Sequence, residues 1–381
     1  MTTTRSEECN AEGPTLYLAL ELSARSWKLA FTTGPGARVR LRTIHAEAWD
    51  KIRDEVVRAK THFRVPSDTP VRSCYEAGRD GFWIHRYLTS LGVTNVVVDS
   101  ASIETPRRPR RAKTDRLDAL RLVGLLMRAH GGDPTWRVVR IPDAADEDRR
   151  QAVRERRTAQ HDRTAVRNRI RGLLVAQGVR LTLRAGFLAR LEAARCWDGT
   201  AVGPELRARL GREWAQLQAI EARLTGLEQA RHQALRAATP APALASVQRL
   251  RQLCGIGEPG AWTLGVEVFA WRHFANRREA GGFLGLTPTP SASGTLRREQ
   301  GISKVGPPAL RALIVQLAWQ WRRRQPLSAL TRWYEQRFGS GGPRARRIGI
   351  IALARRLWIA LWRYVTQGIV PAGAQLKAAS A

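Results

Sequence analysis

The stretch that decides the fold lies near the start of the chain. Residues 15–22 read Thr-Leu-Tyr-Leu-Ala-Leu-Glu-Leu, and residues 27–33 read Trp-Lys-Leu-Ala-Phe-Thr-Thr. Both runs are short, rich in apolar and aromatic side chains, and bounded by turn-forming residues, which is typical of β-strands. Residues 38–44 follow the turn Gly34-Pro35-Gly36 and predict a third strand directly after the first two.

Strand and helix signals then alternate as far as residue 131. The spacing of apolar residues predicts helices at 46–60, 81–91 and 114–130, and strands at 70–75 and 95–99. Thr114 can cap the last of these helices, Asp115 lies in its first turn, and Gly131 ends it. The order βββαβαβα predicts an α/β domain over residues 15–131, with a mixed sheet and helices on both faces.

Residues 132–238 lose the strand signals and predict an all-α region. Nine arginines fall between Arg149 and Arg171, which indicates one long helix with a basic face. Further on, apolar residues recur at intervals of seven, three and four, as in a short coiled-coil seam. The seam either packs within one chain or joins two subunits; its residues are Leu210, Leu217, Ile220, Leu224 and Leu227.

Residues 239–368 predict a third, mainly helical domain, with tails at 1–14 and 369–381. From residue 239 to the end, 21 Lys and Arg stand against 5 Asp and Glu. Such an excess of positive charge suits a surface that holds phosphates. Trp358 and Trp362, with Leu357 and Leu361, form an apolar stripe that we assign to the core.

The composition narrows the class of protein. A net charge of +31 over 381 residues indicates a polyanionic partner, and nucleic acid is the default candidate. The four cysteines form no C-x-x-C pair, so neither a zinc cluster nor a disulfide framework is expected, in keeping with a reducing cytoplasm. The apolar stretch 348–361 is interrupted by Arg355 and Arg356, so we expect no membrane span.

Acidic residues fall at suggestive places in the first domain. Glu21 ends the first strand, Glu76 ends the fourth, and Asp115 and Asp118 share one face of a helix. Enzymes that cut phosphodiesters with metals need several carboxylates at one point, because hard cations prefer oxygen ligands. Strand-end acids and acidic helix faces are also common on solvated surfaces; all four in this order favour a metal site.

Three motifs of this domain resemble a known family. They are Leu20-Glu21-Leu22-Ser23, Tyr75-Glu76-Ala77-Gly78, and Lys113-Thr114-Asp115-Arg116-Leu117-Asp118-Ala119. They are similar to the DEDD RuvC-like domain of insertion-sequence-110 family transposases. The resemblance implies an RNase H-like fold that binds Mg²⁺ or Mn²⁺ through Glu21, Glu76, Asp115 and Asp118. The family has Asp where this chain has Glu21.

The last third of the chain continues the resemblance, in the family's order. Its motifs are Leu253-Cys254-Gly255-Ile256-Gly257, Phe283-Leu284-Gly285-Leu286-Thr287-Pro288, Ser291-Ala292-Ser293-Gly294, Gly301-Ile302-Ser303-Lys304-Val305-Gly306 and Leu310-Arg311. The family's recombination nucleophile is a serine before a glycine, which corresponds to Ser293 here, with Ser291 as the fallback. Cationic side chains would stabilise the charge that develops on phosphorus. We expect nucleic-acid contacts at Lys113, Arg116, Arg297, Arg298, Lys304 and Arg311.

The sequence thus favours a DNA transposase or recombinase that uses a serine nucleophile and a divalent metal. The family resemblance further implies a structured guide (bridge) RNA that pairs with donor and target DNA. It also implies a homodimer or tetramer whose acids and serine meet between subunits, in the bacterial cytoplasm and on the nucleoid when bound. Two alternatives stay open: a metal-dependent junction resolvase without serine chemistry, and an inactive nucleic-acid-binding remnant.

Overall fold

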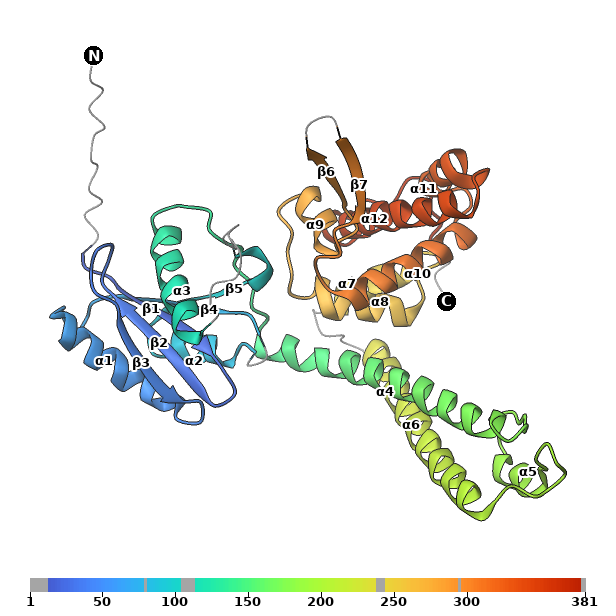
Figure 1. Cartoon of the computed structure of the whole chain (residues 1–381). Helices are drawn as coiled ribbons and strands as arrows, with labels where there is room; N and C mark the ends of the chain where they lie inside the picture. Colours follow the sequence, from blue (N-terminus) through green and yellow to red (C-terminus); the bar gives the residue numbers. More distant parts are fainter. Residues whose placement is uncertain (1–12, 79–80, 104–113, 238–243, 294–295, 378–381) are drawn as a thin grey trace. The chain divides into compact units, whose positions relative to one another are not determined.

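The computed structural model describes residues 13–78, 81–103, 114–237, 244–293 and 296–377, with the backbone alone at 101, 290–293 and 296–300. The chain divides into two compact units, Met1–Ile141 and Pro142–Ala381. We describe each unit by itself (Figure 1).

The first unit has the predicted order of strands and helices, βββαβαβα. A short 3-10 turn, η1 (Trp49–Lys51), precedes α1, and another, η2 (Ser100–Ser102), follows β5. The predicted helix start at residue 46 is wrong, because the Ala46 N–H donates to the Arg25 carbonyl at 3.0 Å and holds this segment as a turn. The main elements are β1 (Leu16–Leu22), β2 (Ser26–Thr32), β3 (Arg40–His45), α1 (Ile52–Phe63), β4 (Val71–Glu76), α2 (Trp83–Ser90), β5 (Thr94–Val98) and α3 (Asp115–His130).

The five strands form one mixed sheet in the order β3-β2-β1-β4-β5. β1, β2 and β3 pair antiparallel, whereas β4 runs parallel to both β1 and β5. Successive side chains of β1 alternate between two cores: Leu18 and Leu20 pack toward α1 and α2, and Ala19 packs toward α3. Helices therefore cover both faces of the sheet, as the sequence predicts (Figure 1).

Strand β5 gains a partner from the chain that follows α3. Val98 forms a bridge with Val138, and the Val139 N–H donates to the Val97 carbonyl at 2.7 Å. These bonds occupy backbone groups of β5 that would otherwise be unpaired. The first compact unit accordingly extends to Ile141.

A buried carboxylate, Glu55, fastens α1 to β3. It is 4% exposed and accepts hydrogen bonds from Arg40 at 3.3 Å, Arg42 at 3.1 Å and Arg58 at 3.0 Å. Burial acts to raise the pKa of Glu55, but the bonds from Arg40 and Arg42 outweigh it, and the pKa lies below its ordinary value. The charged form is therefore stabilised by folding.

We expect Glu55→Gln to destabilise this unit by about 2–3 kcal/mol at neutral pH, because it leaves partly buried arginines without their counter-charge. Since the folded pKa is depressed, the stabilisation is present above the unfolded pKa of about 4.3 and is lost as pH falls through the folded pKa. Urea unfolding at neutral and acidic pH measures this, with Glu47→Gln, whose side chain is 91% exposed, as control. A gap between parent and Glu55→Gln that did not narrow in acid would contradict the expectation.

The second unit is mainly helical. It begins with a long helical hairpin and continues with shorter helices that enclose a core. Its elements are α4 (Ala144–Val175), α5 (Phe187–Ala193), α6 (Pro204–Arg236), α7 (Ala245–Gln252), α8 (Glu258–Leu264), η4 (Gly265–Phe269), α9 (Arg277–Phe283), β6 (Pro288–Ser293), β7 (Leu296–Ile302), α10 (Pro308–Arg324), α11 (Ala329–Tyr334), η5 (Glu335–Gly339) and α12 (Pro343–Gln367).

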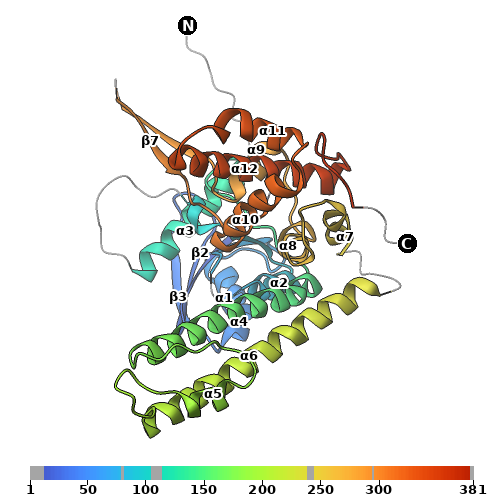
Figure 2. The same ribbon diagram turned by 90° about the vertical axis from the view of Figure 1, so that its right-hand side faces the viewer.

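α4 and α6 lie side by side, with α5 at the far end of the pair (Figures 1 and 2). Apolar residues of α4 such as Ile170 share one core with the α6 residues Leu217 and Ile220. The sequence left two interpretations of the apolar seam, packing within one chain or a contact between subunits. The structure shows packing within the chain. Part of the basic face of α4 is neutralised by α6, since Arg169 pairs with Glu213 at 2.7 Å.

The core of the remaining helices is built on the tryptophan stripe of α12. Trp358 is 0% exposed and donates its indole N–H to the Ala280 carbonyl at 2.6 Å, so the assignment of the stripe to the core is confirmed. A two-stranded ribbon, β6–β7, extends from these helices, where a sequence rich in Ser, Thr and Pro gave no strand signal (Figure 1). Among the described helices, none is long and apolar enough to cross a membrane.

Candidate functional site

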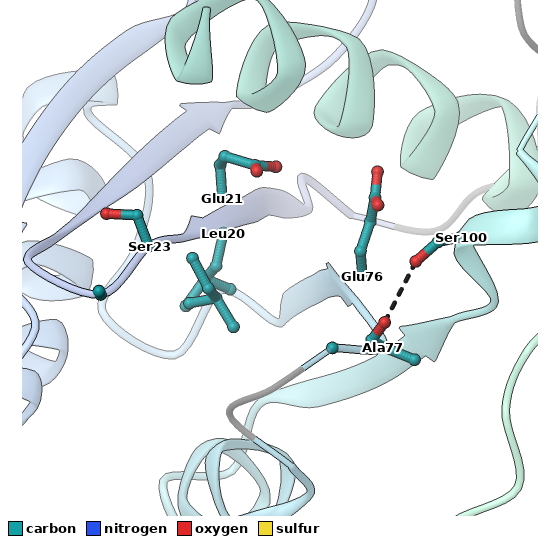
Figure 3. Close-up of a pocket in the computed structure, with 9 residues that line it drawn as sticks. Leu20, Glu21, Ser23, Glu76, Ala77 and Ser100 are labelled. Atoms are coloured by element: carbon teal, nitrogen blue, oxygen red, sulfur yellow. Dashed lines mark hydrogen bonds between the residues drawn. The ribbon is translucent and has the colours of Figure 1, made fainter. Parts of the chain in front are cut away.

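Glu21 and Glu76 come to lie beside each other through the parallel pairing of β1 with β4. Leu20 is the register partner of Tyr75, so the next residues along the two strands are the two glutamates. Because side chains alternate, both glutamates lie on the face that Ala19 and Cys74 turn toward α3. Figure 3 shows the two side chains on the same side of the sheet, the side on which the green helix lies.

A cavity of about 390 Å³ opens at this end of the sheet. Among its described lining residues, the two glutamates are the charged ones. Neighbouring carboxylates repel each other, and a bound cation would relieve the repulsion, so this donor set suits a hard, oxygen-preferring ion such as Mg²⁺ or Mn²⁺. The lining consists of Leu20, Glu21, Leu22, Ser23, Ala24, Glu76, Ala77, Gly78 and Ser100.

Asp115 and Asp118 lie in the first turn of α3, at the same end of the sheet. The Tyr17 hydroxyl is 2.7 Å from Nδ1 of His130, at the last residue of α3. Tyr17 is near the start of β1, so the last residue of α3 lies at the amino end of β1. The first turn of α3, which holds the two aspartates, therefore lies toward the carboxyl end of β1. The Thr114 Oγ1 accepts from the Leu117 N–H at 3.3 Å, which confirms the predicted cap.

The structure groups the four acids as two pairs. Glu21 with Glu76 lines the cavity, whereas Asp115, which is exposed, and Asp118, which is half-buried, do not. In the described part of the chain, no group of three or more His, Cys, Asp or Glu side chains is close enough to hold a metal ion. The structure thus brings together two of the four predicted ligands, Glu21 and Glu76, and does not bring Asp115 and Asp118 into the same group.

Cys74 lies beneath Glu76 on the same strand face. It is fully buried, and burial raises the pKa of its thiol well above the ordinary value, with the Glu76 carboxylate adding to the effect. The Cys74 Sγ is 3.8 Å from the Leu122 carbonyl. Since the thiolate is the nucleophilic form, a raised pKa disfavours nucleophilic chemistry at Cys74.

Lys28 is a cation that the sequence analysis did not single out. It pairs with Glu21 in the β1–β2 register and lies on the same face of the sheet. Its Nζ donates to Thr43 Oγ1 at 2.8 Å on the next strand. The signal was present in the alternation of residues 27–31, where Trp27, Leu29 and Phe31 enter one core and leave Lys28 on the other side.

The predicted serine lies on the β6–β7 ribbon. Ser293 is the last residue of β6 and pairs with Leu296, while Ser291 pairs with Arg298 and Ala292 with Arg297. Partners across an antiparallel pair share a face, so Ser291, Ser293 and Arg298 lie on one face of the ribbon. Arg297 lies on the other face. The register thus separates two arginines that are neighbours in sequence.

Other predicted basic residues are less closely grouped. Arg116 is exposed in the first turn of α3, next to Asp115. Lys304 is exposed just after β7. Arg311 donates from Nη1 to the Leu284 carbonyl at 3.0 Å, so part of its hydrogen-bonding capacity holds the chain together. Lys113 and Gly294 lie outside the described residues.

Two glycines join the base of the ribbon to the loop after α9, in what we call the glycine clasp (residues 283–287 and 303–306). A Cβ on Gly306 would collide with the Phe283 carbonyl, and one on Gly285 would collide with the Val305 backbone. Both glycines have positive φ, and Lys304 between them adopts the left-handed conformation with φ 57°. The Ser303 N–H donates to Thr287 at 2.9 Å and closes the clasp.

We expect Gly306→Ala to displace the ribbon and to destabilise the second unit strongly, because the new methyl group and the φ of +92° are both incompatible with the clasp. Gly301→Ala is the matched control, since Gly301 has φ +84° but open space around its Cβ position. The control should cost about 1–2 kcal/mol of left-handed strain and leave the ribbon in place. Thermal unfolding of both variants separates the effect of strain from that of the collision. Equal losses of stability in the two variants would contradict the clasp.

Comparison of the sequence with known proteins identifies the family of this chain. A Sinorhizobium fredii protein named "Putative transposase y4rJ" is 39% identical over 95% of this chain and 94% of its own length. Residues 247–332, which contain the ribbon and the clasp, match the family described as "Transposase IS116/IS110/IS902 family". The chain belongs to this transposase family. The earlier resemblance to insertion-sequence-110 transposases is thereby confirmed.

Further relatives of this transposase agree. "Putative transposase y4qE" of Sinorhizobium fredii is 30% identical over 65% of the chain and 58% of its own length. "Transposase for insertion sequence element IS1533" of Leptospira borgpetersenii is 31% identical over 29% of the chain and 31% of its own length. Membership in a transposase family implies DNA binding and a role in DNA cleavage and rejoining. The net charge of +31 suits that partner.

Proposed function

We propose that this transposase cuts and rejoins DNA strands through Ser293, assisted by a divalent metal at a RuvC-like carboxylate site. The observation that carries the proposal is the β1–β4 register, which sets Glu21 beside Glu76 in one cavity. Asp115 and Asp118 lie over the same face of the sheet and would complete the ligand set. Bound Mg²⁺ or Mn²⁺ would supply Lewis-acid stabilisation of phosphate oxygens.

The serine step conserves the phosphodiester. The Ser293 hydroxyl oxygen forms a bond to phosphorus, and the bond from phosphorus to the leaving sugar oxygen breaks. That sugar oxygen takes up a proton, and the serine hydroxyl proton passes to a base. The protein–DNA link is again a phosphodiester, so a second DNA hydroxyl can displace serine and join strands without an external energy source.

Arg298 is the cation that we assign to this step, from its position in the strand register. On an antiparallel ribbon, diagonal neighbours lie about 7–8 Å apart, within reach of a long side chain. Arg298 is diagonal to Ser293 and directly opposite Ser291, whichever of the two attacks. Its positive charge would offset the negative charge that develops on the phosphoryl oxygens.

Arg298→Ala is expected to slow covalent adduct formation by about 100-fold, as loss of a preorganised donor commonly does. Arg297→Ala is the matched control, because it removes the same charge from the other face of the ribbon. A single-turnover assay with trapped DNA ends gives the rate, and filter binding gives DNA affinity for both variants. Equal slowing of both variants would mean that the arginines act through general charge and would contradict the assigned face.

We further propose that a structured RNA guides this transposase, with base pairing supplying sequence choice and the protein reading backbone shape. The basic arginines of the second unit suit such a sequence-independent role. We also propose that the active form is a homodimer or tetramer. A search of the DNA flanking the gene for a structured RNA with segments complementary to the donor and target, followed by strand joining with and without that RNA, tests the guidance.

A metal-dependent junction resolvase is the competing function. Glu21 and Glu76 lie in the first unit, whereas Ser293 belongs to the second. Cleavage by water at the two carboxylates would therefore not require the serine. A resolvase would cleave by attack of water and leave free DNA ends. Cleavage that persists in a variant lacking Ser293 separates the two functions.

A further inference from the structure

Trp197 is displayed at the far end of the α4–α6 hairpin, in the loop between α5 and α6. Its side chain is 82% exposed, the largest exposed fraction among the large hydrophobic residues in the described chain. An indole offers a large apolar area, and removing that area from water is favourable. A partner that covers this exposed ring would therefore gain binding free energy from its burial.

The chain around Trp197 is fixed rather than loose. The Cys196 N–H donates to the Thr200 carbonyl at 2.8 Å, and Arg195 forms a bridge with Ala201. Asp198 Oδ1 accepts from both the N–H and the hydroxyl of Thr200, at 3.0 Å and 2.6 Å. The loop is thus a closed turn with Trp197 near its tip.

The same turn is attached to the end of α4. The Trp197 N–H donates to the Gln177 carbonyl at 3.0 Å. Gly178 has φ +74°, and a Cβ there would lie 2.9 Å from the Cβ of Trp197. A glycine is needed so that the tryptophan backbone can approach this closely. An exposed ring on a fixed backbone loses little conformational entropy when it binds, so it is preorganised for contact.

The segment that carries the ring is rich in arginine. Residues 171–201 hold five arginines and two carboxylates. Both carboxylates are already engaged, Asp198 with Thr200 and Glu192 with Arg207 at 2.8 Å. The exposed side chains of Arg171, Arg180 and Arg184 have no hydrogen bond or ion pair within the described residues. Arg180 follows Gly178 by two residues, which places its Cα within about 7 Å of the glycine that contacts Trp197.

We propose that Trp197 is a stacking platform for an unpaired nucleobase, with the neighbouring arginines binding phosphates of the same strand. Aromatic side chains stack on every base because each base has a π-face, while cationic side chains follow the backbone. Bases inside an uninterrupted duplex are already stacked on both faces, so the ligand is a single-stranded or looped segment. The positive surroundings select a nucleic acid over a basic or neutral protein surface. This site lies outside the carboxylates and the serine ribbon, so it stands whether or not Ser293 is the nucleophile.

The test compares three full-length variants by fluorescence anisotropy. Trp197→Ala removes the ring, Trp197→Phe keeps an aromatic face, and Leu188→Ala removes another exposed apolar side chain, 48% exposed, from the same tip. The probes are a labelled single-stranded RNA, a single-stranded DNA of the same sequence, and the corresponding blunt DNA duplex. The two single-stranded probes show whether the sugar matters.

Trp197→Ala should weaken single-strand binding by about 5- to 100-fold, while Trp197→Phe and Leu188→Ala stay close to the parent. Duplex binding and the salt slope of single-strand binding should not change, because stacking releases no counterions. Unchanged single-strand binding by Trp197→Ala, or an equal loss on the duplex, would overturn the proposal. So would a change confined to oligomeric state in sedimentation, which would make the tip a protein–protein contact.

Discussion

Replacing Ser293 with alanine is expected to remove the covalent protein–DNA adduct completely. The proposed reaction transfers the scissile phosphodiester to the serine oxygen, and alanine has no oxygen to accept it. Loss of a nucleophile commonly costs about 10⁴- to 10⁶-fold in rate. Strand joining should therefore fall below detection, while DNA binding, which rests on the arginines, should stay near that of the parent.

A suicide DNA substrate incubated with the transposase and Mg²⁺, with and without RNA transcribed from the gene's flanks, gives the readout on a denaturing gel. Ser291→Ala is the matched control, because Ser291 lies on the same strand and the same ribbon face. The adduct should survive in Ser291→Ala and be absent in Ser293→Ala. The reverse result would place the nucleophile at Ser291. Cleavage without any adduct from the parent would establish the resolvase function instead.

The second large effect is expected at the carboxylates. Glu76→Gln keeps the shape of the side chain but removes its charge from the cavity shared with Glu21. If the pair holds a divalent cation, loss of one ligand charge should cost roughly 4 kcal/mol of transition-state stabilisation, or about 10³-fold in strand joining. Asp118→Asn should have a similar effect if the first turn of α3 completes the site.

Metal binding itself provides the readout that a structural defect would not mimic. Titration calorimetry with Mn²⁺ should show binding to the parent and much weaker binding to Glu76→Gln. In EDTA, where no metal is bound, the parent and the variant should unfold at the same temperature. Glu47→Gln, on an exposed side chain of the same unit, controls for general charge. Strand joining that persists in EDTA would exclude the proposed role of the acids. Glu21→Asp, which restores the family's residue, should keep activity at or above that of the parent.

Much of the first unit could be predicted from the sequence because the signals are local. The side chains of residues 15–22 by themselves favour a strand. Thr114 caps α3 through a hydrogen bond from the N–H of Leu117, three residues away. The tryptophan stripe of α12 was assigned to the core from its spacing alone. In each case the physical cause lies within a few residues of the element that it determines.

The β6–β7 ribbon could not be predicted in the same way. Strand β6 is rich in Ser, Thr and Pro, which favour turns, and strand formation depends on the cross-strand partners that β6 and β7 offer each other. The clasp that holds the ribbon requires glycines at two distant positions for one close approach of the backbone. A glycine in sequence indicates conformational freedom but does not say which segment will approach it.

The candidate site shows the same division. The sequence by itself determined the residue types, the order of the elements in the first unit, the strand-end positions of Glu21 and Glu76, and the helix face shared by Asp115 and Asp118, because strand signals and helical spacing are properties of one segment. Only the tertiary structure decided that the two glutamates are neighbours, that Lys28 lies opposite Glu21, and that Arg298 rather than Arg297 shares the face of Ser293. The physical reason is that strand register depends on pairing between segments that can lie far apart in the chain, and a shift of one residue would turn every side chain to the other face.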